Sequence, residues 1–483
     1  MTMKSFPVLN DASLEDAVEK LLHWSLVHGL VMYPTGFKSF NTNAAPVTLF
    51  PTPFPRDGLN AALNVQTLFN ELYAKVATDE EWLSLIMDEL IDVDKEFTGK
   101  LWQTHKRAKE IGISQPLSLS LVRSDYMLDE NTGKIKQIEY NAISVSFGGL
   151  SPKVSDLHRY LNHAGAYDSR GSQKYYEDGE LATTEASDKL VEGFNDAVKL
   201  YNGRADNNTT IVLVVVQENE RNVFDQRHLE YALLNNHGIK SQRATLSEVS
   251  NVTRIDSESK KIYYIPTGDE ISVIYYRTGY SPSDYSSEAD WETRLQLETS
   301  KAIKCPTLLS QLSGAKKIQQ LLTDRELVSK YISKSNIDTL FSKFVDIWPL
   351  DNSELGKKAK KLAFECPEKF VLKPQREGGG NNIYKEDIPG FLSKLPEDKW
   401  NAYILMDLIS PSTHKNTVIR EDKLYTEDVV SELGIFGTII WDSGTGEIKS
   451  NKTADYLLRS KFSSSNEGGV AAGFGCVDSL YLY

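Results

Sequence analysis

The stretch "FVLKPQREGGGNNIY" (370–384) places three consecutive glycines beside Lys373, Arg376 and Glu377. Ordering three glycines in a row costs much conformational entropy, so the stretch suits a place where a ligand approaches the backbone more closely than a Cβ allows. Backbone N–H groups near a lysine suit phosphate oxygens, and a glutamate there suits a divalent cation lying between it and the phosphates. Taken alone, the stretch is equally compatible with a flexible surface loop.

A second glycine-rich segment, "LLRSKFSSSNEGGVAAGFG" (457–475), lies near the end of the chain. Arg459 and Lys461 are two positions apart, so in an extended chain they share a face. The small residues that follow are typical of a lid that closes over a ligand. The alternative is a disordered C-terminal loop, although Val470 and Phe474 favour packing over solvation.

The segment "IKQIEYNAISVSFGG" (135–149) places Glu139 and Asn141 on one face of a predicted strand. A carboxylate and an amide oxygen are hard ligands of the kind that Mg²⁺ takes. The alternative is a polar pair that faces solvent. Upstream, Arg123 is expected to end another strand.

Two further groups of polar residues follow predicted strands in "VVVQENERNVFDQ" (214–226) and "VIYYRTGY" (273–280). Ligands of open α/β sheets bind beyond the carboxyl ends of the strands, so both groups are candidates for a binding site. For each arginine, a helix-capping or salt-bridge role remains the alternative. The candidate residues are Glu220, Arg221, Asn222, Gln226, Arg277 and Tyr280.

The elements that position these residues are expected to form two or three packed units, given a length of 483 residues. Helical periodicity predicts helices over 13–29, 61–77 and 80–112, the first capped by Ser13-x-x-Asp16 and ended by Gly29. The proline-rich piece 45–56 is expected to be extended.

Strands are expected from about residue 118 onward. A strand–helix–strand run over 211–217, 225–238 and 271–277 predicts a small α/β unit. The fold class that follows is mixed α/β (α+β) with a helical N-terminal part.

Composition excludes several classes of function. With a net charge of −13, the chain is not expected to bind nucleic acid or an anionic membrane surface. The start carries no export signal, and the most apolar run, 211–216, is too short to span a membrane. Three widely separated cysteines predict a reducing compartment, by default the cytoplasm. No recognised nucleophile, P-loop or kinase motif occurs.

Together, two glycine loops, oxygen ligands and arginines predict a site for ATP, Mg²⁺ and an anionic substrate. Chemistry that needs no protein nucleophile is direct phosphoryl transfer to a substrate carboxylate, where positioning and charge stabilisation do most of the catalysis. The acyl phosphate formed in this way is open to attack by an amine.

Several of these segments, with others between them, resemble the eukaryotic glutathione synthetases, in particular the fungal branch, from about residue 28 to the C-terminus. The matching segments are "RSDYM", "IEYNAISVSFGGL", "ERNVFDQ", "YYRTGY", "QLSGAKKIQQLL", "LKPQREGGGNN", "AYILMDLI", "SELGIFG" and "LLRSKFSSSNEGGVAAGFG".

The resemblance implies a circularly permuted ATP-grasp fold. Its parts would be 1–211, the N-terminal part of the catalytic domain; 212–314, an inserted α/β substrate-binding domain; and 315–483, the C-terminal part with the lid and glycine-rich loops. It further implies a homodimer that joins γ-glutamylcysteine to glycine with ATP and Mg²⁺.

The resemblance also assigns residues to roles. The implied metal ligands are Glu139, Asn141 and Glu377, and the implied catalytic residues are Arg123, Lys316, Lys373 and Arg459. The implied ATP contacts are Glu139, Lys316, Lys373, Pro374, Gln375, Arg376, Glu377, Gly378, Gly379, Gly380, Asn381, Asn382, Tyr384, Met406, Asp407, Leu408, Ile409, Glu432, Lys461 and Glu467. The implied dipeptide contacts are Arg123, Ile143, Ser144, Val145, Ser146, Glu220, Arg221, Asn222, Gln226, Arg277, Thr278, Gly279, Tyr280, Arg459, Val470 and Ala471.

Three positions depart from the family pattern: Asp407 in place of a glutamate in the adenine hinge, Thr278 in place of an aspartate, and Tyr140 in place of an apolar residue. The shorter Asp407 side chain is expected to loosen the adenine contact.

Two rival functions are compatible with the resemblance. One is a homologue that uses another acceptor, such as β-alanine or serine, because acceptor choice depends on a few pocket residues. The other is a catalytically inactive nucleotide-binding subunit, which the presence of all the implied metal and phosphate residues disfavours.

Overall fold

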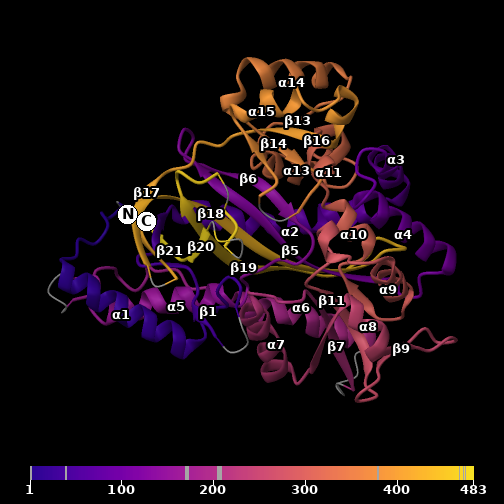
Figure 1. Cartoon of the computed structure of the whole chain (residues 1–483), viewed down its shortest axis with the longest axis horizontal. Helices are drawn as coiled ribbons and strands as arrows, with labels where there is room; N and C mark the ends of the chain where they lie inside the picture. Colours follow the sequence, from indigo (N-terminus) through magenta and orange to yellow (C-terminus); the bar gives the residue numbers. More distant parts are fainter. Residues whose placement is uncertain are drawn as a thin grey trace.

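The computed structural model describes residues 3–37, 41–168, 173–203, 209–377, 380–421, 423–466, 468–470, 473 and 475–483. Its architecture is mixed α/β, with a large central sheet, helices on both sheet faces and a smaller lobe above the sheet (Figure 1). Among the described residues, no helix is both long and apolar enough to cross a membrane.

The N-terminal part is largely helical, as its periodicity predicts. Its helices are α1 (Asp11–His28), α2 (Arg56–Thr78), α3 (Glu80–Ile91) and α4 (Thr98–Ile111). The cap of α1 is Asn10 rather than Ser13, because the Asn10 side chain accepts from the Ser13 N–H. The helix predicted over 80–112 is two helices, since the chain turns at 92–97, where Asp94 accepts from the backbone N–H of Thr98.

The proline-rich piece is extended, as predicted, and contributes two short strands, β3 (Val47–Thr48) and β4 (Thr52–Phe54). A further pair, β1 (Val31–Met32) and β2 (Asn43–Ala44), forms a separate two-stranded sheet. The C-terminal β21 (Leu480–Leu482) runs parallel to β4, so the end of the chain packs beside this N-terminal segment.

The central sheet is built around three long antiparallel strands, β5 (Leu117–Asp129), β18 (Lys423–Asp442) and β19 (Ile448–Phe462). Beyond β19 lie β20 (Gly475–Asp478), β3 and β17 (His414–Arg420). On its other side β5 pairs with two strands, β12 (Ile303–Cys305) near its start and β6 (Lys134–Asn141) along its second half.

The predicted α/β unit continues the central sheet. Strands β8 (Ser241–Thr245), β7 (Thr210–Val216), β11 (Glu270–Tyr276) and β12 are parallel neighbours, and β12 is parallel to β5. The predicted strands and helix correspond to β7, α7 (Val223–His237) and β11. Sequence reasoning missed the elements between α7 and β11, which are β8, α8 (Leu246–Val252), β9 (Thr253–Ile255) and β10 (Ile262–Tyr264).

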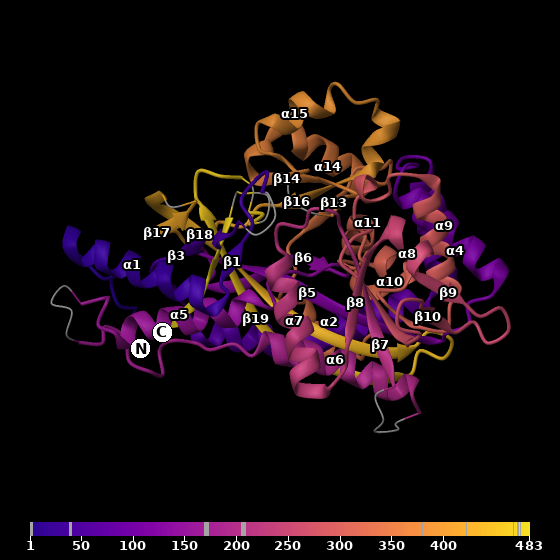
Figure 2. The ribbon, with the colours of Figure 1, turned by 60° about the horizontal axis from the view of Figure 1, so that its bottom comes forward.

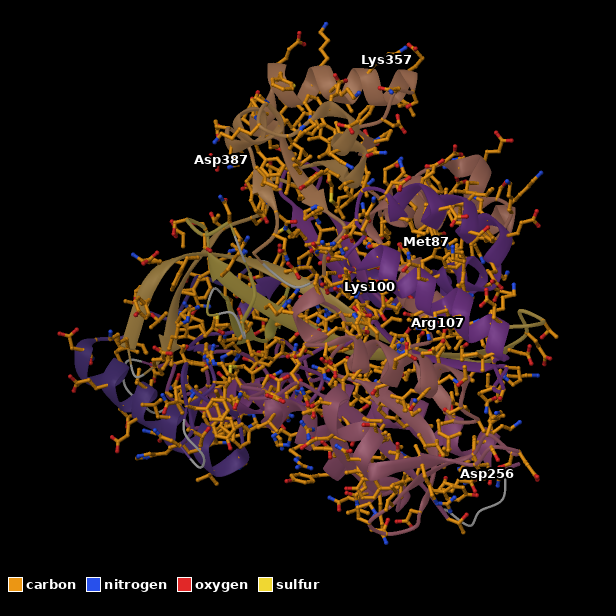
Figure 3. All side chains as sticks on the ribbon, turned by 45° about the vertical axis from the view of Figure 1, so that its right-hand side comes forward. Met87, Lys100, Arg107, Asp256, Lys357 and Asp387 are labelled. Carbon is orange, nitrogen blue, oxygen red and sulfur yellow. The ribbon has the colours of Figure 1, made fainter. Side chains whose placement is uncertain are left out.

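Helix α9 (Glu288–Thr299) of this unit packs against α4. Lys100 and Arg107, on α4, form ion pairs with Glu288 and Glu292 of α9 (Figure 3). The helical N-terminal part and the α/β unit are therefore joined by charged side chains as well as by the sheet.

Two glycines allow helices to lie close on the two faces of the sheet. A Cβ on Gly437 of β18 would lie 2.4 Å from Asn70 Oδ1 of α2, and one on Gly193 of α6 (Ala186–Tyr201) would lie 2.8 Å from Thr438 Cγ2. Helices α6, α5 (Leu150–His163) and α7 run along the lower side of the molecule (Figure 2). Both faces of the sheet are thus covered by helices.

The smaller lobe holds a sheet in the order β13 (Ile347–Pro349), β16 (Tyr403–Asp407), β14 (Phe370–Pro374) and β15 (Ile383–Tyr384). With α14 (Glu354–Glu365) and α15 (Asp387–Leu392) it encloses its own apolar core (Figure 1). It is linked to the central sheet through α10 (Leu308–Ser313), α11 (Lys316–Leu321), α12 (Arg325–Val328) and α13 (Lys334–Phe341).

Candidate active site

Lys316 brings two of the expected metal ligands together where the lobe meets the central sheet. Its Nζ atom lies 2.6 Å from Glu139 Oε1 on β6, and it donates to Glu377 Oε1 and Oε2, just beyond β14, at 2.9 and 3.0 Å. Lys316 itself is the first residue of α11 and is buried. Three segments far apart in the sequence therefore meet at one ammonium group.

The carboxyls of Glu139 and Glu377 carry more negative charge, when both are ionised, than the single ammonium group of Lys316 can balance. Burial favours the neutral form of a carboxylate, but the charges of Lys316 and Lys373 outweigh burial at Glu139 and lower its pKa. At Glu377 burial prevails over Lys316, and the pKa of this carboxyl is raised. A divalent cation here would add to the charges of the two lysines and favour the ionised form of both carboxyls.

Lys373 lies at the same place, because its Nζ donates to the backbone oxygen of Ile138, directly before Glu139, at 2.9 Å. Burial lowers the pKa of this ammonium group, with Glu139 opposing. Lys316 and Lys373 thus form a pair of cations above β6, as a phosphate site requires.

A second cluster lies on the same face of β5 and β6, around Asp125. Arg123 Nε and Nη2 donate to the two oxygens of Asp125 at 2.6 and 2.8 Å, and Asn141 Nδ2 donates to Asp125 Oδ2 at 2.9 Å. Arg459, on β19, donates to Asp125 Oδ2 at 3.2 Å and also pairs with Glu432. The predicted residues Arg123, Asn141, Arg459 and Glu432 are therefore brought together.

Two corrections concern this cluster. Arg123 does not end its strand but lies within β5, which continues to Asp129 because its second half pairs with β6. Asp125 was missed, although it stands two positions after Arg123 in the segment "RSDYM" and so shares its face. Burial and the neighbouring charge of Arg123 lower the pKa of Arg459 to about 10, while Asp125 opposes that shift.

The loop 143–146, expected to contact the dipeptide, lies against the end of β11. Arg277 Nη1 donates to the backbone oxygen of Val145 at 2.5 Å, and Nη2 donates to Ser146 Oγ at 2.6 Å. Ser144 has φ of 53° and donates through Oγ to the backbone oxygen of Tyr276 at 3.1 Å. Ile143 is buried.

Asp225, which sequence reasoning also missed, holds the next residues of this loop. Its carboxylate accepts from the N–H groups of Phe147 and Gly149 at 2.7 Å each and from that of Leu150 at 3.1 Å. Because Asp225 lies on the first turn of α7, it fixes the loop relative to the group at 220–226.

The remaining polar residues of that group are bonded to one another. Glu220 accepts from the backbone N–H of Asn222 and from Gln226 Nε2, both at 2.8 Å. Tyr280 Oη accepts from Gln217 Nε2 at 2.9 Å. Gly279 has φ of 86°, which favours glycine, and the neighbouring Thr278 is buried.

Arg376, a predicted ATP contact, is paired with an acidic side chain in this structure. Its guanidinium forms a two-pronged ion pair with Asp94, in the turn between α3 and α4, and Nη2 donates to Asp94 Oδ1 at 2.8 Å. The preceding Gln375 accepts from the backbone N–H of Lys317 at 3.0 Å and donates to the backbone oxygen of Ala402 at 3.1 Å. The stem of the glycine-rich loop is therefore tied to α11, to Ala402 directly before β16 and to the α3–α4 turn.

The loop itself is described only in part. Gly378 and Gly379 lie outside the described residues, as do Glu467 and Ala471 of the C-terminal segment. Gly380 has φ of 94°, and Asn382 donates through Nδ2 to Tyr384 Oη at 3.1 Å. In the C-terminal segment, Lys461 Nζ donates to the backbone oxygen of Asn466 at 2.6 Å, and Val470 is buried.

The expected adenine hinge, 406–409, lies at the end of β16. Trp348 Nε1 donates to Asp407 Oδ1 at 2.9 Å, and the N–H of Leu408 donates to the backbone oxygen of Lys369 at 2.8 Å. Met406 is buried, whereas Ile409 is partly exposed. The Asp407 carboxylate is therefore directed at Trp348, and burial raises its pKa.

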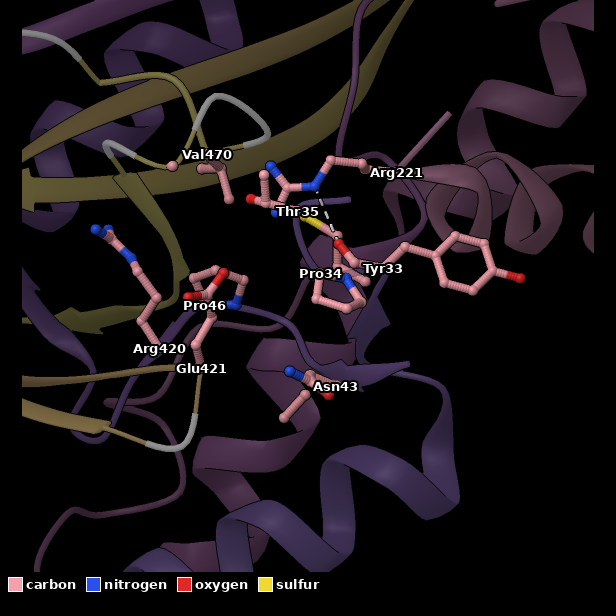
Figure 4. A pocket seen from close by; sticks show the side chains of 12 residues that line it. Tyr33, Pro34, Thr35, Asn43, Pro46, Arg221, Arg420, Glu421 and Val470 are labelled. Carbon is pink, nitrogen blue, oxygen red and sulfur yellow. Dashed lines mark hydrogen bonds between the residues drawn. The ribbon is translucent and has the colours of Figure 1, made fainter. Parts of the chain in front are cut away.

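A cavity of about 240 Å³ opens between the two-stranded sheet of β1 and β2 and the glycine-rich segment 457–475 (Figure 4). Arg221 and Arg420 approach it from opposite sides, and Val470 lies near the top of the view between them. Arg221 Nε donates to the backbone oxygen of Tyr33 at 3.1 Å. Two predicted dipeptide contacts, Arg221 and Val470, thus share one cavity with residues from the first part of the chain.

Comparison with known proteins gives consistent matches. The family model "Eukaryotic glutathione synthase, ATP binding domain" matches residues 11–482. The glutathione synthetase large chain of Schizosaccharomyces pombe is 39% identical, over 95% of this chain and 96% of its own. The glutathione synthetase of Dictyostelium discoideum is 35% identical, over 98% and 100%.

A solved structure agrees on the fold. A glutathione synthetase-like effector from Globodera pallida, in its apo form, superposes with a TM-score of 0.77 at 22% identity and covers 100% of both chains. The mixed α/β architecture is thus that of a glutathione synthetase-like protein, consistent with an ATP-grasp-type fold. The resemblance seen in the sequence is confirmed, and this chain belongs to the eukaryotic glutathione synthase family.

Proposed function

We propose that this chain is a ligase that joins γ-glutamylcysteine to glycine, converting ATP to ADP and phosphate. Its membership of the family supports the reaction. The observation that carries the proposal is the meeting of Glu139, Lys316 and Glu377, because a phosphoryl-transfer site needs cations and oxygen ligands at one point.

We further propose that Mg²⁺ is held by Glu139, Asn141 and Glu377. Among the described residues no three His, Cys, Asp or Glu side chains gather into a possible metal site. That fits Mg²⁺, which is usually held by one or two carboxylates together with substrate phosphates. When bound, Mg²⁺ neutralises phosphate charge. The partly buried carboxylates of Glu139 and Glu377 supply the matching oxygens.

The chain's own residues would divide the remaining work. Lys316 and Lys373 bind phosphate oxygens, while Arg123 and Arg459 hold the substrate carboxylate that receives the phosphoryl group and stabilise the charge that develops on it. Loop 143–146 and the groups at 220–226 and 277–280 position the dipeptide. The segment 457–475 excludes water, which would hydrolyse an acyl phosphate.

The assignment of the other ATP and dipeptide contacts, and of the parts 1–211, 212–314 and 315–483, is likewise our proposal.

We also propose that the chain forms a homodimer and lies in the cytoplasm. Free cysteines at 305, 366 and 476 support a reducing compartment. Exposed apolar side chains on α1, Leu26 and Val27, support a covered face there. Analytical ultracentrifugation tests the homodimer, and the location of a fluorescent fusion in the cell tests the cytoplasmic assignment.

The reaction is tested by incubating the purified chain with ATP, MgCl₂, γ-glutamylcysteine and, separately, glycine, β-alanine or serine. We expect phosphate release to be fastest with glycine, accompanied by stoichiometric tripeptide. Faster turnover with β-alanine or serine would identify that amine, rather than glycine, as the acceptor. No acceptor-dependent phosphate release would contradict the ligase itself.

A further inference from the structure

Asp125 lies at the centre of the arginine cluster and is fully buried. It stands opposite Glu139 on β6 and opposite Gly434 on β18, so it occupies the middle strand beneath the site. A carboxylate there needs compensation, because a buried charge is stable only when it is paired and hydrogen-bonded.

The four donors around Asp125 all come from residues proposed for the reaction. Arg123 supplies two of them, at 2.6 and 2.8 Å, Asn141 supplies one at 2.9 Å, and Arg459 supplies one at 3.2 Å. An ionised carboxylate can accept about four such bonds; here three of the donors lie on Oδ2 and one lies on Oδ1. One acidic side chain therefore touches a metal-ligand candidate and two arginines.

The contact with Asn141 sets the direction of an amide. Asn141 Nδ2 donates to Asp125 Oδ2 at 2.9 Å and to the backbone oxygen of Arg123 at 3.4 Å, which leaves the carbonyl oxygen Oδ1 on the opposite side of the amide. Were the amide turned over, its oxygen would face a carboxylate and a carbonyl, which repel it. Only the observed orientation presents an oxygen to a cation.

The arginines need the same carboxylate for another reason. Two guanidinium groups that both lie on Asp125 would repel one another without it. The neighbouring strand also leaves room for this arrangement: a Cβ on Gly434 would lie 2.7 Å from Arg123 Cδ and 3.0 Å from Asp125 Oδ1. The glycine in β18 thus allows the Arg123–Asp125 pair to lie across the sheet.

We propose that Asp125 is a positioning residue, which orients the amide of Asn141 toward a divalent cation and holds Arg123 beside Arg459. This inference rests on the proposed function, since it assumes that Asn141 is a metal ligand and that the arginines hold the substrate carboxylate.

The test uses Asp125→Asn, which keeps the shape of the side chain but replaces one acceptor oxygen with a donor. Binding of Mn²⁺ together with a non-hydrolysable ATP analogue is measured by electron paramagnetic resonance, and KM for γ-glutamylcysteine is measured separately. We expect the Mn²⁺ dissociation constant and this KM each to rise at least tenfold.

The matched control is Asp290→Asn. Asp290 is also buried, but it accepts from Ser287 at the start of α9 and touches none of these residues. It is expected to alter the melting temperature while leaving Mn²⁺ binding and KM near the wild-type values. A merely structural role for Asp125 would make the two variants alike in both readouts.

If Asp125→Asn fails to fold, Gly434→Ala provides the test of the positioning role, because its Cβ displaces the Arg123–Asp125 pair without removing a charge. It should weaken Mn²⁺ binding and raise KM in the same direction. Wild-type Mn²⁺ affinity in the folded variant would overturn the inference, whatever the reaction. A wild-type enzyme that binds Mn²⁺ and nucleotide but forms no tripeptide would instead overturn the proposed function.

Discussion

The Nζ atom of Lys316 lies 2.6 Å from Glu139 Oε1, which joins the start of α11 to the end of β6. Glu377 meets the same ammonium group from the lobe. Lys316 therefore occupies the position between two carboxylates where a cation is required, and it holds the lobe against the central sheet.

This arrangement predicts that Lys316→Met destabilises the enzyme without ligands. Removing one member of a buried ion pair leaves an uncompensated charge, and losses of about 3 kcal/mol are typical. We expect a lower melting temperature that Mg²⁺ and ADP partly restore, and a fall in kcat/KM of at least a hundredfold. The control is Lys317→Met, since Lys317 Nζ contacts Gln320 and the partly exposed Asp351 rather than the two glutamates. Equal melting curves for the two variants would contradict the prediction.

Replacing Glu377 with Gln tests the proposed metal site. The amide keeps one ligand oxygen but lacks the charge that binds the metal, so kcat should fall by orders of magnitude while circular dichroism stays unchanged. Glu139→Gln should behave in the same way. Near-normal turnover of Glu377→Gln at saturating Mg²⁺ would show that this carboxylate is not a ligand.

The ion pair between Arg376 and Asp94 predicts a shared effect on ATP binding. If Arg376 acts through Asp94, by holding the stem of the glycine-rich loop, Asp94→Asn and Arg376→Met should raise KM for ATP by similar factors, and the double variant should be no worse than either. If the rise in KM for ATP in the double variant equals the product of the rises in the two single variants, Arg376 contacts the nucleotide independently of Asp94, as the family resemblance implies.

Asp478 predicts a pH dependence of stability outside the site. Burial raises the pKa of this carboxyl to about 6, although Ser460, Thr52 and Thr48 donate to it. The unfolded chain has a pKa near its ordinary value of about 3.9. The folded state therefore binds the proton more tightly, and the stabilisation present below about pH 4 is lost as the pH rises through about 6.

The Asp478→Asn variant lacks this titration. The free energy of unfolding of the variant, relative to that of the wild type, should therefore rise by roughly 2 kcal/mol between pH 4.5 and 7, and its relative melting temperature should rise with it. A difference that stays constant over this range would mean that Asp478 has the same pKa in both states.

Local patterns predicted the helices of the N-terminal part, helix α7 and strands β7 and β11, but not the elements between α7 and β11. Helix α1 ends at Gly29, with φ of 74°, as the sequence indicates, because a helix stop depends on neighbouring residues alone. The position of Arg123 within β5 was not predictable in the same way, since it depends on pairing with β6. Strand ends are set by partners that a single segment does not contain.

In the candidate site, too, some residues are indicated by their local sequence and others only by partners elsewhere in the chain. Glu139, Asn141 and Glu377 stand in short segments whose residue types indicate metal ligands. Asp94 carries no such signal, because its partner Arg376 is 282 positions away. Asp125 stands two positions from Arg123, but its contacts with Asn141 and Arg459 come from other segments. Which acid meets which base is decided by the fold.

The central claim is that phosphate passes from ATP to the carboxylate of γ-glutamylcysteine before glycine attacks. The most direct measurement uses dipeptide with ¹⁸O in the reacting carboxylate and mass spectrometry of the released phosphate. Transfer through an acyl phosphate leaves one ¹⁸O atom in each phosphate, and we predict this result for the wild-type enzyme. Unlabelled phosphate, formed together with the tripeptide, would contradict the account.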